Sequence, residues 1–359
     1  GTSSNFPGYE PGAPANTRLR WEKTTQRNIG MDAVLLNNRL NVSFDYFQKE
    51  THDVIVRKTL PLYDGGYDVW QNLGQINNKG FEFSADYRLV DKNSFSWDLG
   101  FNLSSVKNKV ISLNTPDDYI LTGDYGSGIV ATKPFIIKPG HPLGSFWGPK
   151  YLGLWKTDEA AEALKFGNQP GDSKYEDLNG DYVINSSDYQ IIGDANPDFT
   201  FGINNTFYYK NFTLNILVDG VHGNQVLNLL YAVAAVPVAE SRTITLKEGA
   251  DVWTSTNQDA SFPALSSTNI NNMNSSRWLQ DGSFVKVRNV SLSYNLPRRV
   301  LKFADLKLAI SGQNLLTITK YKGYDPEVSN GGSYDAESCI DMGAYPLPRF
   351  FTTQIVLTF

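Results

Sequence analysis

The segment Pro348-Arg-Phe-Phe-Thr-Thr-Gln-Ile-Val-Leu-Thr-Phe359 alternates apolar and polar side chains up to the last residue. One parity is mainly apolar and the other mainly polar: Phe351, Thr353, Ile355, Leu357 and Phe359 against Thr352, Gln354, Val356 and Thr358. Successive side chains of a β-strand point to opposite faces, so this pattern predicts a strand with one apolar and one polar face. A closed barrel gives such a strand a partner for its hydrogen-bonding edge, and a barrel whose apolar face points outward lies in lipid.

Eight other segments show the same two-residue period, which predicts an all-β chain of about nine antiparallel strands. The clearest segment is 80–89, where Phe81, Phe83 and Ala85 alternate with acidic and hydroxyl side chains. The expected strands cover 25–36, 39–51, 80–89, 95–104, 197–209, 211–221, 283–295, 305–314 and 348–359. Each has about ten residues or slightly more, the length that a tilted strand needs to cross a bilayer.

The connections between these strands alternate between short and long. Short polar or proline-containing turns are expected at 37–38, 91–93, 210–211 and 297–304, and long loops at roughly 52–76, 108–196, 222–282 and 315–347. Outer-membrane barrels have short periplasmic turns and long external loops, so this asymmetry favours a transmembrane barrel with long extracellular loops. A soluble β-sandwich is the alternative, in which the apolar faces point inward and the connections at both ends are usually short.

Composition excludes several other classes of protein. No apolar stretch approaches the roughly 20 residues of a membrane helix. The net charge of −5 and the lack of a Lys/Arg run do not indicate nucleic-acid binding. Cys339 has no internal disulfide partner, and three scattered histidines do not indicate a zinc site. An odd number of strands, together with a start that has neither Met nor a signal peptide, predicts the C-terminal part of a longer barrel.

Several motifs, in an order and spacing that cover almost the whole chain, resemble the SusC/RagA family of TonB-dependent outer-membrane transporters. They are Leu19-Arg-Trp-Glu-Lys-Thr-Thr-Gln-Arg-Asn-Ile-Gly30, Asn78-Lys-Gly-Phe-Glu82, Gly140-His-Pro-Leu-Gly-Ser-Phe-Trp-Gly148, Pro170-Gly-Asp-Ser-Lys-Tyr-Glu-Asp-Leu-Asn-Gly-Asp181, Asn196-Pro-Asp-Phe-Thr-Phe-Gly202, Gly323-Tyr-Asp-Pro-Glu327 and Tyr345-Pro-Leu-Pro-Arg349. The resemblance implies that 1–359 is the C-terminal part of one barrel domain in the outer membrane of a Gram-negative bacterium.

The same resemblance implies a 22-stranded barrel with an N-terminal plug and a short box that TonB engages, neither of which is visible in this chain. It also implies a SusD-like surface lipoprotein that closes over the external loops as a lid, and a cargo of glycan fragments or peptides. Phe359 matches the aromatic-ended signal that the barrel assembly machinery recognises. The final strand is then expected to end at the periplasmic face and to pair with the first strand of the complete protein.

The long 108–196 loop contains a twelve-residue stretch that is similar to a dockerin-type calcium loop. Its oxygen ligands at positions 1, 3, 5, 7, 9 and 12 would be Asp177, Asn179, Asp181, the Val183 carbonyl, Asn185 and Asp188. Two departures are Tyr182 where the usual residue is Gly, and Asp at the last position where it is usually Glu. The alternative is a turn that caps itself by side-chain hydrogen bonds and holds no ion. A bound Ca²⁺ would have a structural role in pinning this loop.

Aromatic side chains on the long loops are candidates for cargo binding, and Trp147, Tyr151 and Trp155 are the three selected here. Packing within the loops, or a girdle at the membrane interface, is the alternative for each of them. Trp97 and Tyr87, close to short turns, are interpreted as girdle residues. The apolar stretch 224–236 predicts a short helix.

No catalytic set is found: the chain lacks a G-x-S-x-G elbow and a phosphate-binding glycine loop. The resemblance to the SusC/RagA family implies that the function is TonB-dependent import of nutrient oligomers. A non-transporting adhesin or structural barrel, and a secreted carbohydrate-binding β-protein, are the alternatives.

Overall fold

The computed structural model describes residues 15–59, 67–72, 74–113, 115, 118–123, 133–235, 251–265, 273–297, 300–301, 303–328 and 337–359. Its main feature is a nine-stranded sheet in the order β1-β2-β5-β6-β13-β14-β17-β18-β20, in which every neighbouring pair is antiparallel. Residues 1–14, and residues 329–336 of the predicted 315–347 loop, lie outside the described residues.

All nine strands of this sheet coincide with segments predicted from the alternation. Their bounds are Lys23–Leu35 for β1, Leu40–His52 for β2, Gln75–Lys92 for β5, Phe95–Ser112 for β6, Phe199–Tyr209 for β13, Phe212–His222 for β14, Phe284–Leu296 for β17, Asp305–Thr319 for β18 and Phe350–Thr358 for β20. The sequence underestimates β5 and β6, which have 18 residues each. The residues of these strands next to the long connections, such as Gln75-Ile-Asn-Asn78, lack strict alternation. They belong to the strands because they pair with the neighbouring strand.

The strand register separates apolar and polar side chains into rows on opposite faces. One row of directly paired residues crosses eight strands and is apolar throughout: Ala33, Val42, Ala85, Phe101, Ile203, Val218, Val287 and Leu316. The adjacent row lies on the opposite face and contains no large apolar side chain: Asp32, Ser43, Ser84, Asn102, Gly202, Asp219, Lys286 and Thr317. We call these the apolar face and the polar face.

The apolar face remains exposed in the described structure. Ile29, Ile310 and Phe351 are 79%, 57% and 79% exposed, and aromatic pairs such as Trp97–Phe207, with ring centroids 5.4 Å apart, cover part of it. A row of exposed apolar side chains across a whole sheet requires an apolar medium, which lipid supplies to an outer-membrane barrel. No helix within the described part of the chain is both long and apolar enough to span a membrane.

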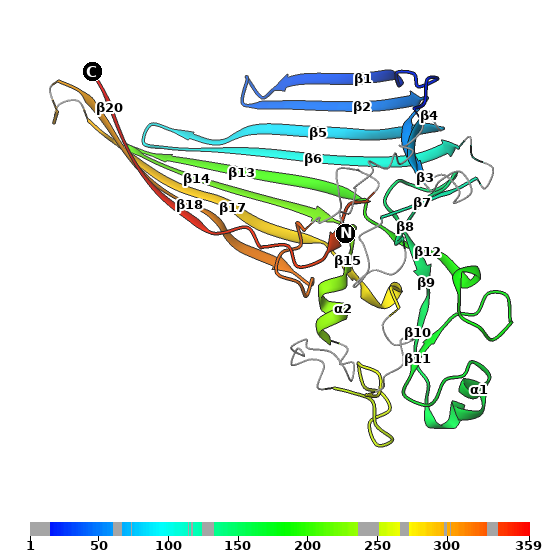
Figure 1. The fold of residues 1–359 in the computed structure, drawn as a ribbon. Helices are drawn as coiled ribbons and strands as arrows, with labels where there is room; N and C mark the ends of the chain where they lie inside the picture. Colours follow the sequence, from blue (N-terminus) through cyan, green and yellow to red (C-terminus); the bar gives the residue numbers. More distant parts are fainter. Residues whose placement is uncertain are drawn as a thin grey trace, which may run out of the picture.

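The short and long connections lie at opposite ends of the sheet (Figure 1). Short turns of residues 36–39, 93–94, 210–211 and 297–304 join strands at one end, and long connections of residues 53–74, 113–198, 223–283 and 320–349 join them at the other. The C-terminus lies at the short-turn end, where the ring of Phe359 stacks on that of Phe303 with centroids 6.5 Å apart. Among the described strands, β1 and β20 each have one partner within the sheet, and barrel closure and the total of 22 strands stay predictions.

The long connections, predicted only as loops, form four smaller sheets. These are β12-β9-β8-β7, β16-β15-β19, β10-β11 and β3-β4, built from β3 (Ile55–Thr59), β4 (Asp68–Asn72), β7 (Ile120–Thr122), β8 (Phe135–Ile137), β9 (Ser145–Pro149), β10 (Tyr151–Leu154), β11 (Ser173–Tyr175), β12 (Tyr189–Asp194), β15 (Gln225–Asn228), β16 (Leu279–Asp281) and β19 (Ile340–Asp341). The helices are α1 (Ala160–Lys165) and α2 (Leu229–Ala235). The predicted helix over 224–236 is therefore shorter, because Gln225–Asn228 pair with β16 and β19 instead.

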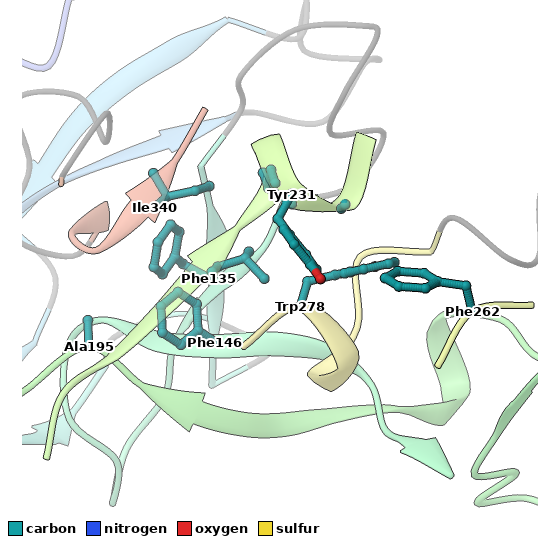
Figure 2. Close-up of a cluster of buried hydrophobic side chains, with 10 residues drawn as sticks. Phe135, Phe146, Ala195, Tyr231, Phe262, Trp278 and Ile340 are labelled. Carbon is teal, nitrogen blue, oxygen red and sulfur yellow. The ribbon is translucent and has the colours of Figure 1, made fainter. Parts of the chain in front are cut away.

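A hydrophobic core joins three of the long connections into one packed unit, which we call the loop body (Figure 2). Phe135 and Phe146 come from residues 113–198, Tyr231 and Trp278 from residues 223–283, and Ile340 from residues 320–349. Trp278 is 1% exposed, and Phe135, Phe146 and Ile340 are fully buried. Burying side chains of this size contributes about 1.5–3 kcal/mol each. This core packs three of the four long connections together at the end of the sheet that carries them.

Candidate functional site

A cluster of charged side chains connects the polar face of the sheet to the loop body. Lys286 of β17 belongs to the polar row, and its side chain is only 2% exposed. Its ammonium group donates to Asp325 Oδ1 at 2.7 Å and to Glu327 Oε2 at 2.6 Å. Both carboxylates follow β18, so these bonds place residues 325–327 on the polar face. A lysine this deeply buried requires such partners, because an unpaired buried charge is strongly destabilising.

Arg288 extends the cluster through an irregularity in β17. The register shifts between Val287 and Asn289 on both neighbouring strands, so Arg288 is the extra residue of a β-bulge. Its guanidinium group donates to both carboxylate oxygens of Asp219, at 2.8 and 2.5 Å, and to both of Glu327, at 2.9 and 2.7 Å. Such paired, charge-assisted bonds are among the stronger polar interactions in proteins.

The cluster contains two cations and three carboxylates, and Glu327 is shared by both cations. Burial alone would raise the pKa of the Glu327 carboxyl, but hydrogen bonds from Arg288 and Lys286 outweigh burial and lower that pKa below its ordinary value. The carboxylate therefore stays ionised, as both bonds require. The sequence assigns no role to this cluster, although Asp325 and Glu327 belong to the quoted motif Gly323–Glu327.

A second polar contact fixes the same connection nearby. The hydroxyl of Tyr321, two residues after the end of β18, donates to Asp341 Oδ2 at 2.6 Å. Burial raises the pKa of the Tyr321 hydroxyl, and the hydrogen bond to the Asp341 carboxylate raises it further. Asp341 Oδ1 accepts from the backbone of Gly343 and Ala344. The polar cluster and the Tyr321–Asp341 bond together determine where the last long connection crosses the end of the sheet.

The three aromatic residues predicted to bind cargo lie in the loop body but do not form one surface. Trp155 is 2% exposed and packs on Phe166, with ring centroids 5.5 Å apart. The ring of Tyr151 is covered by the guanidinium group of Arg277 at 4.8 Å. Trp147 packs edge-on against Tyr189 at 6.4 Å. These contacts are the loop packing that the alternative interpretation expects, and cargo binding by Trp147, Tyr151 and Trp155 stays a prediction.

The stretch proposed to bind calcium forms a turn closed by its own hydrogen bonds. The Asp177 carboxylate accepts from the backbone N–H groups of Gly180 and Tyr182 at 2.7 and 3.0 Å. Fully buried Asp188 accepts from Leu178 and Asn185 at 3.0 and 2.9 Å. The other predicted ligands are also bonded within the turn: Asp181 to Asn179 and Val183, and Asn185 to Val183 and Ser187.

Two observations bear on whether this turn fits a cation. Tyr182 adopts a φ of +63°, the left-handed conformation for which glycine is usual at this position of a calcium loop. However, no group of three His, Cys, Asp or Glu side chains within the described residues is arranged to hold a metal ion. The hydrogen bonds are those of the self-capped alternative, although a carboxylate oxygen that accepts one bond retains a lone pair for a cation. Calcium binding stays a prediction.

Comparison with known proteins identifies the family. The family model described as TonB dependent receptor-like, beta-barrel matches residues 1–315. The chain belongs to this family. TonB-dependent receptor P3 of Formosa agariphila is 36% identical over 357 residues, covering 96% of this chain and 35% of that protein. TonB-dependent receptor SusC of Bacteroides thetaiotaomicron is 27% identical, covering 96% of this chain and 32% of that protein. The chain thus spans about a third of the length of the curated relatives it matches.

Solved structures show the same fold. A structure of the RagAB peptide transporter superposes with a TM-score of 0.79 at 21% identity, covering 94% of this chain and 36% of that one. The RagAB peptide importer in the "open-open" state gives a TM-score of 0.76 at 22% identity, covering 95% and 35%. The predicted all-β antiparallel fold, the resemblance to SusC and RagA, and the outer-membrane location are confirmed. The relatives are receptors and transporters, so the chain belongs to a family that is not enzymatic.

Proposed function

We propose that the complete protein imports nutrient oligomers across the outer membrane in a TonB-dependent manner. This chain would supply part of the barrel wall and the external loops. The separation of the two faces supports the proposal most directly, because the apolar row suits contact with lipid and the polar row suits the lining of a hydrophilic path. The polar cluster around Lys286 would hold the last long connection at the entrance of that path.

Glycan fragments or peptides are the proposed cargo. The RagAB protein, whose solved structure has the same fold, is described as a peptide transporter. The glycan part of the proposal rests on the resemblance to SusC. A SusD-like lipoprotein would cover the loop body as a lid. The plug and the box that TonB engages would lie in the part of the relatives that this chain does not span. TonB would pull on the plug to open the path, at the expense of the inner-membrane proton gradient.

Uptake by intact cells tests this proposal. A strain deleted for the gene and complemented with the complete protein should accumulate a fluorescent oligomer, and accumulation should stop when TonB is removed or the proton gradient is collapsed. The same cells should still bind the oligomer at the surface. Accumulation that persists without TonB would contradict the proposal, and surface binding without any accumulation would support the adhesin alternative.

A further inference from the structure

A polar hollow lies at the long-loop end of the sheet, between the segment that precedes β1 and the β3–β4 hairpin. Its volume is about 430 Å³, and it is lined by Asn16, Arg18, Arg20, Asp53, Gln71 and Asn72. Figure 1 shows this N-terminal segment, in dark blue, beside β4 at the end of the sheet that carries the long connections. Under the proposed function, that end faces the outside of the cell.

The backbone on both sides of the hollow is fixed by side-chain amide bonds. Asn72 Oδ1 accepts from the N–H of Arg20 at 2.7 Å, and Asn72 Nδ2 donates to the carbonyls of Arg20 and Asp53 at 2.8 and 2.7 Å. Asn16 Nδ2 donates to the carbonyl of Trp70 at 2.8 Å. These bonds join residues 16–20 to the hairpin, so the two arginines extend from an ordered backbone. A fixed backbone reduces the entropy lost when the arginines bind a ligand.

Neither Arg18 nor Arg20 forms an ion pair with a carboxylate of the described residues, although Arg88 and Arg288 both do. Asp53 lines the same hollow without pairing with either guanidinium group. The charged residues that line the hollow, Arg18, Arg20 and Asp53, give it an excess of one positive charge. A ligand with an anionic group would accept charge-assisted hydrogen bonds from the two guanidinium groups.

The surroundings indicate what kind of anion would fit. A guanidinium group binds carboxylate and sulfate through two parallel hydrogen bonds. The Asp53 carboxylate can accept hydrogen bonds from hydroxyl groups around such an anion, and the Gln71 amide can accept or donate them. Trp21, 89% exposed, is adjacent in sequence to Arg20, and Trp70, 44% exposed, is adjacent to Gln71. Flat aromatic faces beside polar groups are suited to stacking on sugar rings.

We propose that this hollow binds an acidic sugar residue of an oligosaccharide, through its carboxylate or sulfate group, as part of cargo capture. The proposal rests on the proposed function, because it specifies one chemical class of cargo for the same importer. Arg18 and Arg20 would hold the anionic group, while Asn16 and Asn72 would fix the position of both arginines. Neutral oligosaccharides and acidic peptides would bind this hollow weakly or not at all.

Titration of the purified complete protein tests the site without requiring transport. Binding of a uronate oligosaccharide, a sulfated oligosaccharide, a neutral oligosaccharide and an acidic peptide of similar length would be measured by calorimetry. The Arg18→Gln/Arg20→Gln variant should lose roughly tenfold or more in affinity for the acidic sugars and remain unchanged toward the neutral one. Arg349→Gln, which removes a positive charge elsewhere on the exposed surface, is the matched control. The two acidic sugars show whether carboxylate or sulfate is preferred.

Three binding results would overturn the proposal. These are no binding of either acidic sugar to the wild type, an equal loss for acidic and neutral sugars, and a preference for the acidic peptide. A lower unfolding temperature of the double variant without a charge-selective loss would also overturn it, since the arginines would then pair within the complete protein. Because binding is measured without TonB, failure of this site would leave TonB-dependent uptake intact, and failure of uptake would leave the binding result intact.

Discussion

The ammonium nitrogen of Lys286 lies 2.6 Å from a carboxylate oxygen of Glu327, and this contact joins the wall of the sheet to the connection that follows β18. The lysine is on the polar face of the sheet, opposite the exposed apolar face. The contact therefore links the two parts of the chain, the antiparallel sheet and the loop body. Because Glu327 also binds Arg288, removing one member of the cluster leaves charges unpaired elsewhere in it.

Replacement of Lys286 by methionine should destabilise the protein. The variant leaves Asp325 with no ammonium partner and Glu327 with Arg288 alone, so breaking this buried pair should lower the free energy of unfolding by about 3–5 kcal/mol. Thermal or denaturant unfolding of the complete protein in detergent measures the change. Lys307→Met is the matched control, because Lys307 of β18 is exposed and its loss should cost little. Equal effects of the two substitutions would contradict the role given to the cluster.

Glu327 should make stability depend on pH. Its folded-state pKa is lowered, so its contribution is fully present above the ordinary glutamate pKa of about 4.3 and is lost as the pH falls through the lowered value. Glu327→Gln should therefore unfold at a lower temperature than the wild type at neutral pH, and the difference should shrink as the pH falls below about 4. Unfolding temperatures measured between neutral and acidic pH test this. A difference that stays constant over that range would show that the carboxylate charge is unimportant.

Alternation predicted the main sheet because each of its strands has one apolar face and one polar face. Apolar and polar side chains therefore alternate along the sequence with a period of two residues. The loop body was predicted poorly for the same reason. Its strands, such as Phe135–Ile137, are two to six residues long, and several are buried on both sides, so they have no such period. The apolar triplet in Phe135–Ile137 is the kind of signal that could have indicated a buried strand.

The ion cluster could not be predicted from local sequence. Asp219 and Arg288 are 69 residues apart, and Lys286 and Glu327 are 41 apart. Their contact depends on strand register and on a bulge at Arg288. Similarly, Trp155 has the character of a cargo-binding residue in sequence but lies within the loop packing. Residue type indicated a possible contact, and only the three-dimensional arrangement showed the partner.

A calcium ion in the turn 177–188 should make the unfolding of the loop body sensitive to chelators. We expect the chelator to lower the unfolding temperature of the wild type and calcium to restore it, because a bound ion stabilises only the folded turn. Asp181→Asn should weaken the response, and Asp259→Asn, outside the turn, should preserve it. An unchanged unfolding temperature with chelator would support the turn that is closed by hydrogen bonds alone.

Site-directed labelling of the two faces tests the central claim most directly. Phe83 pairs with Phe44 and Leu103 on the apolar face, and the next residue, Ser84, pairs with Ser43 and Asn102 on the polar face. Phe83→Cys and Ser84→Cys would be introduced separately into the complete protein carrying Cys339→Ser, and each would be exposed in membranes to a lipid-soluble thiol reagent. The fold predicts labelling at position 83 and none at position 84. Labelling at position 84 by the lipid-soluble reagent, or at position 83 by a membrane-impermeant reagent, would contradict the membrane-facing assignment of the apolar face.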